Sequence, residues 1–134
     1  MSQINLVGQK KLIHDLEKKI NSGRLAHSYL LFGPSGSGKL SVAIKFAELI
    51  LCSKYKDREL EVIGAQQKIN CLNHPDLHFV YPVVKKGSEK IVLANDYGQD
   101  WAVFLNDNPY GNYANWFESI NVGNKQGLIG VNEI

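Results

Sequence analysis

The sequence predicts an α/β fold in which helices flank a parallel sheet. Three consecutive segments indicate it: an apolar run at 28–32, a glycine-rich turn at 33–38 and an amphipathic stretch at 39–52. A short apolar run bounded by Gly and Pro favours a buried strand, whereas the longer stretch has helical spacing. A second apolar run at 77–81 completes the strand–helix–strand order that is typical of parallel sheets.

The segment before the turn is expected to form an amphipathic helix over 9–22. Its lysines lie largely off one face, on which the apolar residues recur at helical spacing: Leu12, Ile13, Leu16 and Ile20. Gly23 is suited to end this helix, because the residue after a helix C-terminus often adopts a left-handed conformation.

Beyond residue 52 the pattern is less regular. Residues 53–70 are charged and are interpreted as an irregular connection. Further short strands are expected at 91–93 and 128–131.

From residue 95 onward, aromatic side chains alternate with Asn, Asp and Gly. This region predicts two short helices, at 99–106 and 113–120, joined by a turn at Asn108-Pro109. We expect its large aromatic residues to pack in a core or a subunit interface rather than to stack on nucleic-acid bases; they are Trp101, Phe104, Trp116 and Phe117.

Composition and length are those of an ordinary globular chain. The 134 residues suffice for one domain, and 44% hydrophobic with 21% charged residues is typical of soluble proteins. No apolar run reaches the roughly 20 residues of a membrane span, and the N-terminal residues lack the apolar core of a secretory signal. We therefore expect a cytoplasmic protein.

Charge is unevenly distributed along the chain. Residues 1–60 carry ten Lys or Arg against five Asp or Glu, whereas residues 61–134 carry five against eight. The basic half contains the glycine-rich turn and suits an anionic ligand or partner. This half holds no motif of a DNA-binding module, so most of its excess of positive charge is interpreted as a solvated surface.

The glycine-rich turn carries a phosphate-binding motif. Gly33, four further residues, Gly38 and Lys39 match the P-loop pattern. Glycines let backbone N–H groups point inward around phosphates, the following helix presents its N-terminus, and the lysine contacts the β- and γ-phosphates. The predicted nucleotide-binding residues of this motif are Pro34, Gly36, Ser37, Gly38, Lys39, Leu40 and Ser41.

The motif departs from the pattern at the metal-binding position. A Ser or Thr normally supplies a hydroxyl to Mg²⁺ there, but this chain has Leu40, which offers no oxygen. Ser41 follows, but one helical step turns its side chain about 100° away. We therefore expect weak ATP or ADP binding, with Mg²⁺ poorly held and hydrolysis impaired.

Other parts of an NTPase centre are missing from the sequence. No apolar strand ending in Asp-Glu follows the turn, and the nearest match, at 128–133, has Asn132 in place of the aspartate. The only arginines are Arg24 and Arg58. No residue is therefore assigned a catalytic role, and a small P-loop kinase, which needs these groups, is the weaker alternative.

Several strings together resemble a known family. They are Val7-Gly8-Gln9, Gly-Arg-Leu-Ala-His-Ser-Tyr-Leu at 23–30, the P-loop, Leu51-Cys52 and His74-Pro75-Asp76. The combination is similar to the clamp-loader subunits of bacterial DNA polymerase III, delta-prime and gamma/tau, which belong to the AAA+ class. The strings most similar to delta-prime proteins of the Bacteroidetes type are 74–83, 38–40, Asn108-Pro109-Tyr110, Trp116 and 124–127.

This resemblance implies a role in loading the sliding clamp on primed DNA during replication. It implies that Val7, Gly8 and Gln9 border an adenine pocket and that Lys39 contacts phosphate. The implied partners are the delta and gamma/tau subunits, with the clamp and primed DNA reached through the assembled complex. Delta-prime is commonly a non-hydrolysing member, which agrees with Leu40; an active gamma/tau-like ATPase is the alternative.

The resemblance also implies that residues 1–134 are the N-terminal part of an AAA+ P-loop domain. Residues 53–73 would be a degraded zinc-module insertion, and 95–127 an aromatic and Asn-rich insertion. The strand with the acidic pair would lie beyond residue 134. We therefore expect the 28–32 strand to have an unpaired edge and the chain to self-associate.

Zinc is not expected. The family usually has four cysteines after the P-loop helix, but this chain has only Cys52 and Cys71. Together with His74 and His78 they have the spacing of no standard zinc site. We expect two thiols and surface histidines, and a packed, hydrogen-bonded His27 rather than a catalytic base.

Overall fold

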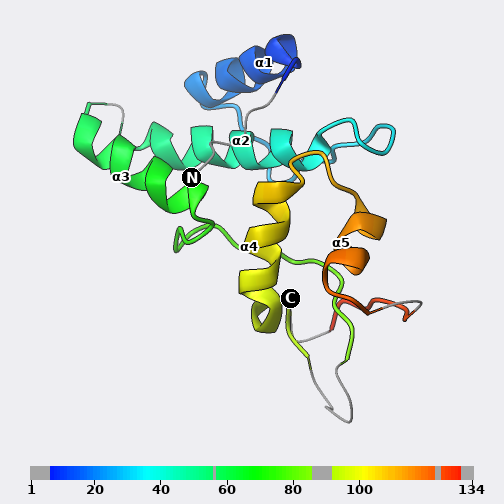
Figure 1. The fold of residues 1–134 in the computed structure, drawn as a ribbon. Coiled ribbons are helices and arrows are strands. Elements are labelled where there is room, and N and C mark those ends of the chain that lie inside the picture. The colour runs from blue at the N-terminus through cyan, green and yellow to red at the C-terminus, as the bar shows by residue number, and fades with distance from the viewer. Residues whose placement is uncertain (1–6, 56, 86–91, 123–124, 131–134) are drawn as a thin grey trace. The chain divides into compact units, whose positions relative to one another are not determined.

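The computed structural model describes residues 7–55, 57–85, 92–122 and 125–130. The chain divides into two compact units, Met1–Leu77 and His78–Ile134, each described by itself. Its helices are α1 (Lys10–Asn21), α2 (Lys39–Ser53), α3 (Glu59–Asn70), the 3₁₀ helix η1 (Ala94–Tyr97), α4 (Gly98–Asp107) and α5 (Tyr113–Ser119) (Figure 1). Within the described residues, none of them combines the length and the apolar character needed to cross a bilayer.

The core of the first unit lies where α1 packs on α2. Leu16, Val42 and Phe46 are buried together, and the partly buried side chains against them are Ile13, Ile20, Leu31 and Ile50. The predicted helices at 9–22 and 39–52 are therefore confirmed, because their apolar faces meet. Figure 1 shows α2 between α1 and α3.

The end of α1 confirms the stop predicted at Gly23. Gly23 has φ +68° and donates its N–H to Ile20 O at 3.0 Å, while Arg24 N–H donates to Lys19 O at 3.1 Å. These two hydrogen bonds form a Schellman motif, whose left-handed residue is usually glycine.

The interpretation of 53–70 as an irregular connection is wrong, because Glu59–Asn70 forms α3. Ala65 and Ile69 are buried and Val62 is partly buried, so the inward residues recur at helical spacing. Acidic residues begin the helix and Lys68 lies in its last turn, which suits the helix dipole. The apolar set is sparse, and this is why the periodicity is hard to read from the sequence.

The predicted parallel sheet is absent from the described residues. Residues 28–32 form neither helix nor strand. Tyr29 packs edge-on against Phe46, with ring centroids 4.9 Å apart, whereas Leu30 and Phe32 are 86% and 89% exposed. A strand is defined by hydrogen bonds to a neighbour, and a short apolar run alone does not supply that neighbour. The predicted self-association of this segment stays a prediction.

The core of the second unit is aromatic. Tyr81 stacks on Trp101 with ring centroids 4.1 Å apart, and Trp116 meets Trp101 edge-on at 5.0 Å. Phe104 and Phe117 are also buried. The helices predicted at 99–106 and 113–120 are confirmed as α4 and α5, and these aromatic residues form a core, as expected.

Side-chain hydrogen bonds replace a sheet in holding the segment at 77–84. Tyr81 Oη donates to Ala94 O at 2.6 Å, Tyr97 Oη to Val84 O at 2.7 Å, and Trp116 Nε1 to Pro82 O at 2.8 Å. The strand predicted at 77–81 is not formed. In the described part of the chain, β-pairing is limited to an isolated antiparallel bridge between Val83 and Leu128.

Two other predicted strands fall partly outside the described residues. Ile91 of the 91–93 run and Val131 of the 128–131 run are not described. Val92 and Leu93 form no strand, and Leu128 pairs through two reciprocal hydrogen bonds with Val83, at 2.9 and 3.0 Å.

Candidate nucleotide-binding site

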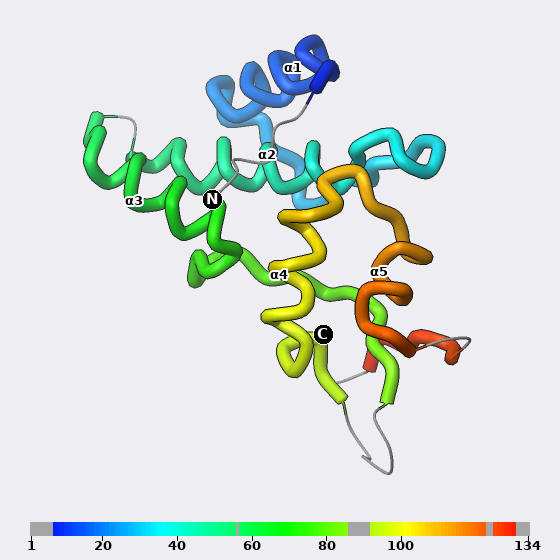
Figure 2. The backbone as a smooth tube through the Cα atoms, in the orientation of Figure 1, coloured from blue at the N-terminus to red at the C-terminus, as the bar shows by residue number. Residues whose placement is uncertain are grey.

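Backbone conformation in the turn at 33–38 depends on its glycines. Gly36 and Gly38 have φ +74° and +77°, and Gly33 has φ +158°. Residues other than glycine rarely adopt the conformations of Gly36 and Gly38. A Cβ on Gly33 would also lie 3.3 Å from Ser37 Oγ. In Figure 2 the turn leads directly into α2.

The N-terminus of α2 suits an anion. Lys39 is its first residue, and no side chain caps the helix at Gly38. The first N–H groups of a helix have no partners within the helix and carry partial positive charge, so phosphate oxygens are suitable acceptors for them.

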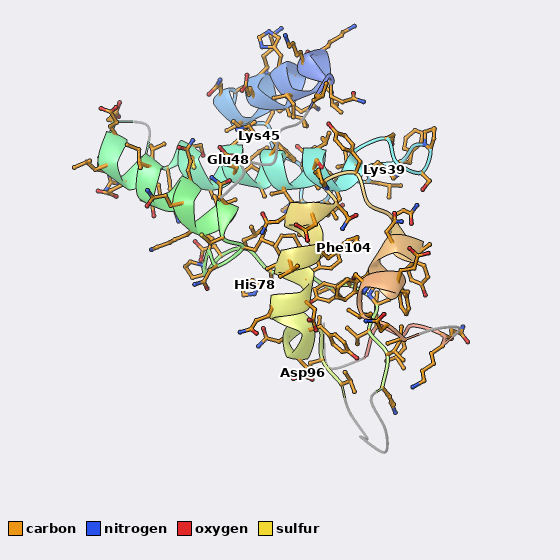
Figure 3. The ribbon with its side chains drawn as sticks, in the orientation of Figure 1. Lys39, Lys45, Glu48, His78, Asp96 and Phe104 are labelled. Atoms are coloured by element: carbon orange, nitrogen blue, oxygen red, sulfur yellow. The ribbon has the colours of Figure 1, made fainter. Side chains whose placement is uncertain are left out.

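Lys39 folds back over the turn. Its Nζ donates to Gly33 O at 3.0 Å and to Pro34 O at 2.7 Å. Figure 3 shows Lys39 at the N-terminal end of α2, beside the turn. The Lys39 ammonium is therefore positioned at the turn. On contact with a phosphate, it would donate its hydrogen bonds to phosphate oxygens instead of to these carbonyl oxygens.

Neither residue after Lys39 presents a ligand for Mg²⁺. Leu40 has no oxygen in its side chain, and Ser41 is 2% exposed, so its hydroxyl is buried within the fold. The turn and Lys39 fit a phosphate group, whereas Leu40 and Ser41 do not fit the metal that accompanies it in hydrolysing P-loops.

The residues predicted to border an adenine pocket precede α1. Val7 is 79% exposed, and Gly8 and Gln9 both have left-handed backbone conformations, with φ +81° and +55°. Gln9 O accepts a hydrogen bond from Ile13 N at 3.0 Å, which starts the helix. Their contact with adenine stays a prediction.

The candidate zinc ligands differ in burial. Cys71 and His78 are exposed and Cys52 is half-buried, but His74 is 6% exposed, so its prediction as a surface histidine is wrong. Its Nδ1 accepts from Asp76 N–H at 3.1 Å, which orders the His-Pro-Asp turn. In the part of the chain that the structure describes, no three His, Cys, Asp or Glu side chains gather as a metal site requires.

His27 also differs from its prediction, because it is exposed rather than packed. Both cysteines are unbridged thiols, as expected. Burial raises the pKa of the Cys52 thiol, the Glu48 carboxylate raises it further, and Lys45 opposes them.

A cavity of about 400 Å³ in the first unit was not predicted. Its polar lining includes Glu48, whose Oε1 accepts from Lys45 Nζ at 2.9 Å and from Gln66 Nε2 at 3.2 Å. Figure 3 labels Lys45 and Glu48 on α2. Gln66 and Val62 in its lining come from α3. Because that helix was not predicted from the sequence, the cavity could not be predicted either.

Comparison with known proteins gives one family. Residues 8–115 match the family described as DNA polymerase III, delta subunit. A "DNA polymerase III subunit delta'" of Bacillus subtilis (strain 168) is 35% identical over 74 residues, which is 55% of this chain and 22% of that relative. The match thus spans about a fifth of the relative's length. No solved structure matches the chain.

Proposed function

This chain belongs to the DNA polymerase III delta-subunit family, and from that membership we propose that it acts as a delta-prime-type subunit of the clamp loader. Its role is to help load the sliding clamp on primed DNA during replication. The proposed partners are the delta and gamma/tau subunits, with the clamp and DNA reached through the assembled complex. The Bacillus subtilis relative, named as subunit delta', supports the subunit type. The similarity to delta-prime proteins of the Bacteroidetes type rests on the sequence strings alone.

The proposed subunit binds ATP or ADP weakly and does not hydrolyse it. The observation that carries this proposal is Leu40 at the metal-binding position, together with the buried Ser41 that follows it. Pro34, Gly36, Ser37, Gly38 and Lys39 hold the phosphates in this proposal. The metal-dependent stabilisation of charge on the transferred phosphoryl group is missing.

The competing function is an active gamma/tau-like ATPase, and the intact glycine turn with Lys39 favours it. The two functions differ in turnover. We expect the chain to show weak, Mg²⁺-independent nucleotide binding and phosphate release far below about 1 per second, a typical lower value for enzymes. Turnover at or above that rate would show that the active ATPase is the better description.

The nucleotide test uses three variants in titrations with ATP and ADP. Lys39→Ala should abolish binding, because it removes the charge at the turn. Lys68→Ala, at an exposed lysine on α3, is the matched control and should bind as the parent does. Leu40→Thr restores the missing hydroxyl, so it should make binding depend on Mg²⁺.

Assembly and metal content are tested separately. The full chain should co-purify with delta and gamma/tau subunits, and failure to do so would contradict the clamp-loader role whatever the nucleotide result. Elemental analysis of protein purified without chelator should find no stoichiometric zinc.

A further inference from the structure

One face of α1 is lined by basic side chains. At about 100° per residue, Lys10, Lys11, His14 and Lys18 fall within one continuous strip of the helix surface. All four side chains are exposed. The opposite strip contains Leu16, which is buried, and Ile13 and Ile20, which pack on the α1–α2 core. The orientation of the basic face is therefore set by the core.

This basic face is only weakly neutralised. Among the described residues, no carboxylate lies within ion-pair distance of Lys10, Lys11 or Lys18. Glu17 lies 3.9 Å from His14 and also lines the cavity of the first unit. Asp15 is the exposed acid that remains on α1.

We propose that the face formed by Lys10, Lys11, His14 and Lys18 binds the phosphate backbone of duplex DNA. Lys11 and Lys18 are separated by roughly 10 Å along the helix axis, which spans about three phosphates at about 3.4 Å per strand. Lysines bind phosphates as point charges and need no base-specific geometry. The choice of DNA among polyanions rests on the proposed function.

The packing of α1 argues against an anionic membrane as the partner. An amphipathic helix that lies on a bilayer inserts its apolar face, but the apolar face of α1 is packed on α2. An acidic protein surface is the other polyanion to distinguish, and the experiment includes it.

The test measures binding of the full chain to a labelled primer–template duplex by fluorescence anisotropy at several salt concentrations. Each phosphate contact contributes a slope of about −0.9 to the dependence of log K on log salt. Lys10→Glu/Lys11→Glu/Lys18→Glu should weaken binding at low salt by at least about tenfold and make the slope shallower by about 3. Lys10→Arg/Lys11→Arg/Lys18→Arg should bind as the parent does.

The matched control is Lys68→Glu/Lys85→Glu/Lys125→Glu, which changes the formal charge equally at three exposed lysines outside α1. It should keep affinity within about threefold of the parent. Because all six lysines are exposed, circular dichroism should show folded variants. Equal losses in the two triple variants, or a parent chain without salt-dependent duplex binding, would overturn the proposal.

A second measurement separates this proposal from the proposed function. Parent and α1 variant are both tested for association with delta and gamma/tau subunits. Loss of subunit association with unchanged duplex binding would assign the face to an acidic protein and overturn the proposal. A parent chain that binds no subunit contradicts the clamp-loader role, but the duplex measurement still decides whether α1 binds DNA.

Discussion

Two glycines show how a single methyl group has opposite effects in different surroundings. A Cβ on Gly111 would lie 2.7 Å from Phe104 Cζ and 2.9 Å from Asn108 Cβ, so the buried ring would have to move. A Cβ on Gly64, inside α3, would have no atom within 4 Å. The first site is sterically closed and the second is open.

We therefore expect Gly111→Ala to lower the free energy of unfolding by about 1–3 kcal/mol, the usual effect of overpacking. Gly64→Ala should raise it by up to about 1 kcal/mol, because alanine favours a helix over glycine. Urea unfolding of the two variants beside the parent measures both changes. A Gly111→Ala variant that is as stable as the parent, or more stable, would contradict the packing described around Gly111.

The two cysteines should differ in reactivity. Burial and the Glu48 carboxylate raise the pKa of the Cys52 thiol, whereas Cys71 is exposed. Since the thiolate is the nucleophile, a thiol reagent at neutral pH should modify Cys71 first. Single-cysteine variants, Cys52→Ser and Cys71→Ser, give the two rates.

The raised pKa of the Cys52 thiol also predicts that the stability of the chain depends on pH. The native state holds the Cys52 proton more tightly than the unfolded chain does, so this contribution to stability is complete below the ordinary thiol pKa of about 8.5. It is lost as pH rises toward the native pKa. Cys52→Ser should remove this loss of stability at alkaline pH. In the labelling experiment, faster modification of Cys52 than of Cys71 would show that the burial of Cys52 is misjudged.

Individual residues of the site were predictable only where a local pattern defines them. The P-loop pattern identifies Lys39 and Leu40 from spacing, because the turn, its glycines and the helix are contiguous in sequence. The hydrogen bonds of Lys39 to Gly33 and Pro34 depend on a side-chain rotamer, which spacing does not specify. The burial of His74 depends on packing around the His-Pro-Asp turn, and the sequence contains no signal for it.

At the scale of elements, α1 and α3 end in the same motif with different residues. After α3, Leu72 has φ +54°; its N–H donates to Ile69 O, and Asn73 N–H donates to Lys68 O, both at 2.8 Å. Leu72 thus occupies the left-handed position that Gly23 occupies after α1. A side chain in this conformation costs about 1–2 kcal/mol.

Gly23→Ala should therefore destabilise the chain by about 1 kcal/mol, and the absence of any atom within 4 Å of its Cβ makes the cost purely conformational. Leu72→Gly should be more stable than Leu72→Ala by about 1 kcal/mol, since both remove the leucine side chain and only one relieves the backbone. Equal stability of the two Leu72 variants, measured in urea, would count against a left-handed Leu72.

The elements that were predicted correctly have dense periodic patterns. α1 and α2 have continuous apolar stripes, and α4 and α5 have aromatic residues at helical spacing that pack on each other. α3 was missed because its few inward residues, Val62, Ala65 and Ile69, are small or widely spaced, and Gly64 and the polar run at 66–68 interrupt them. The predicted strands were not found because strand formation depends on a hydrogen-bonded neighbour, and periodicity within one segment does not identify that neighbour.

At the scale of the whole molecule, the two compact units have different cores. The first is an aliphatic core with Phe46, formed by α1 and α2, and the second is an aromatic core around Trp101 and Trp116. Both tryptophans of the chain lie in the second unit. Tryptophan fluorescence therefore reports on the second unit, whereas far-ultraviolet circular dichroism reports on the helices of both.

We expect the two signals to give separate transitions in urea, because chains with more than one compact unit often depart from two-state unfolding. Gly111→Ala should move the fluorescence midpoint. It should leave in place the part of the dichroism transition that reports on the helices of the first unit. Gly23→Ala should move the dichroism transition without moving the fluorescence midpoint. If Gly111→Ala shifts the whole dichroism transition, or Gly23→Ala shifts the fluorescence midpoint, the chain unfolds as one cooperative body, and the division at Leu77 and His78 has no energetic meaning.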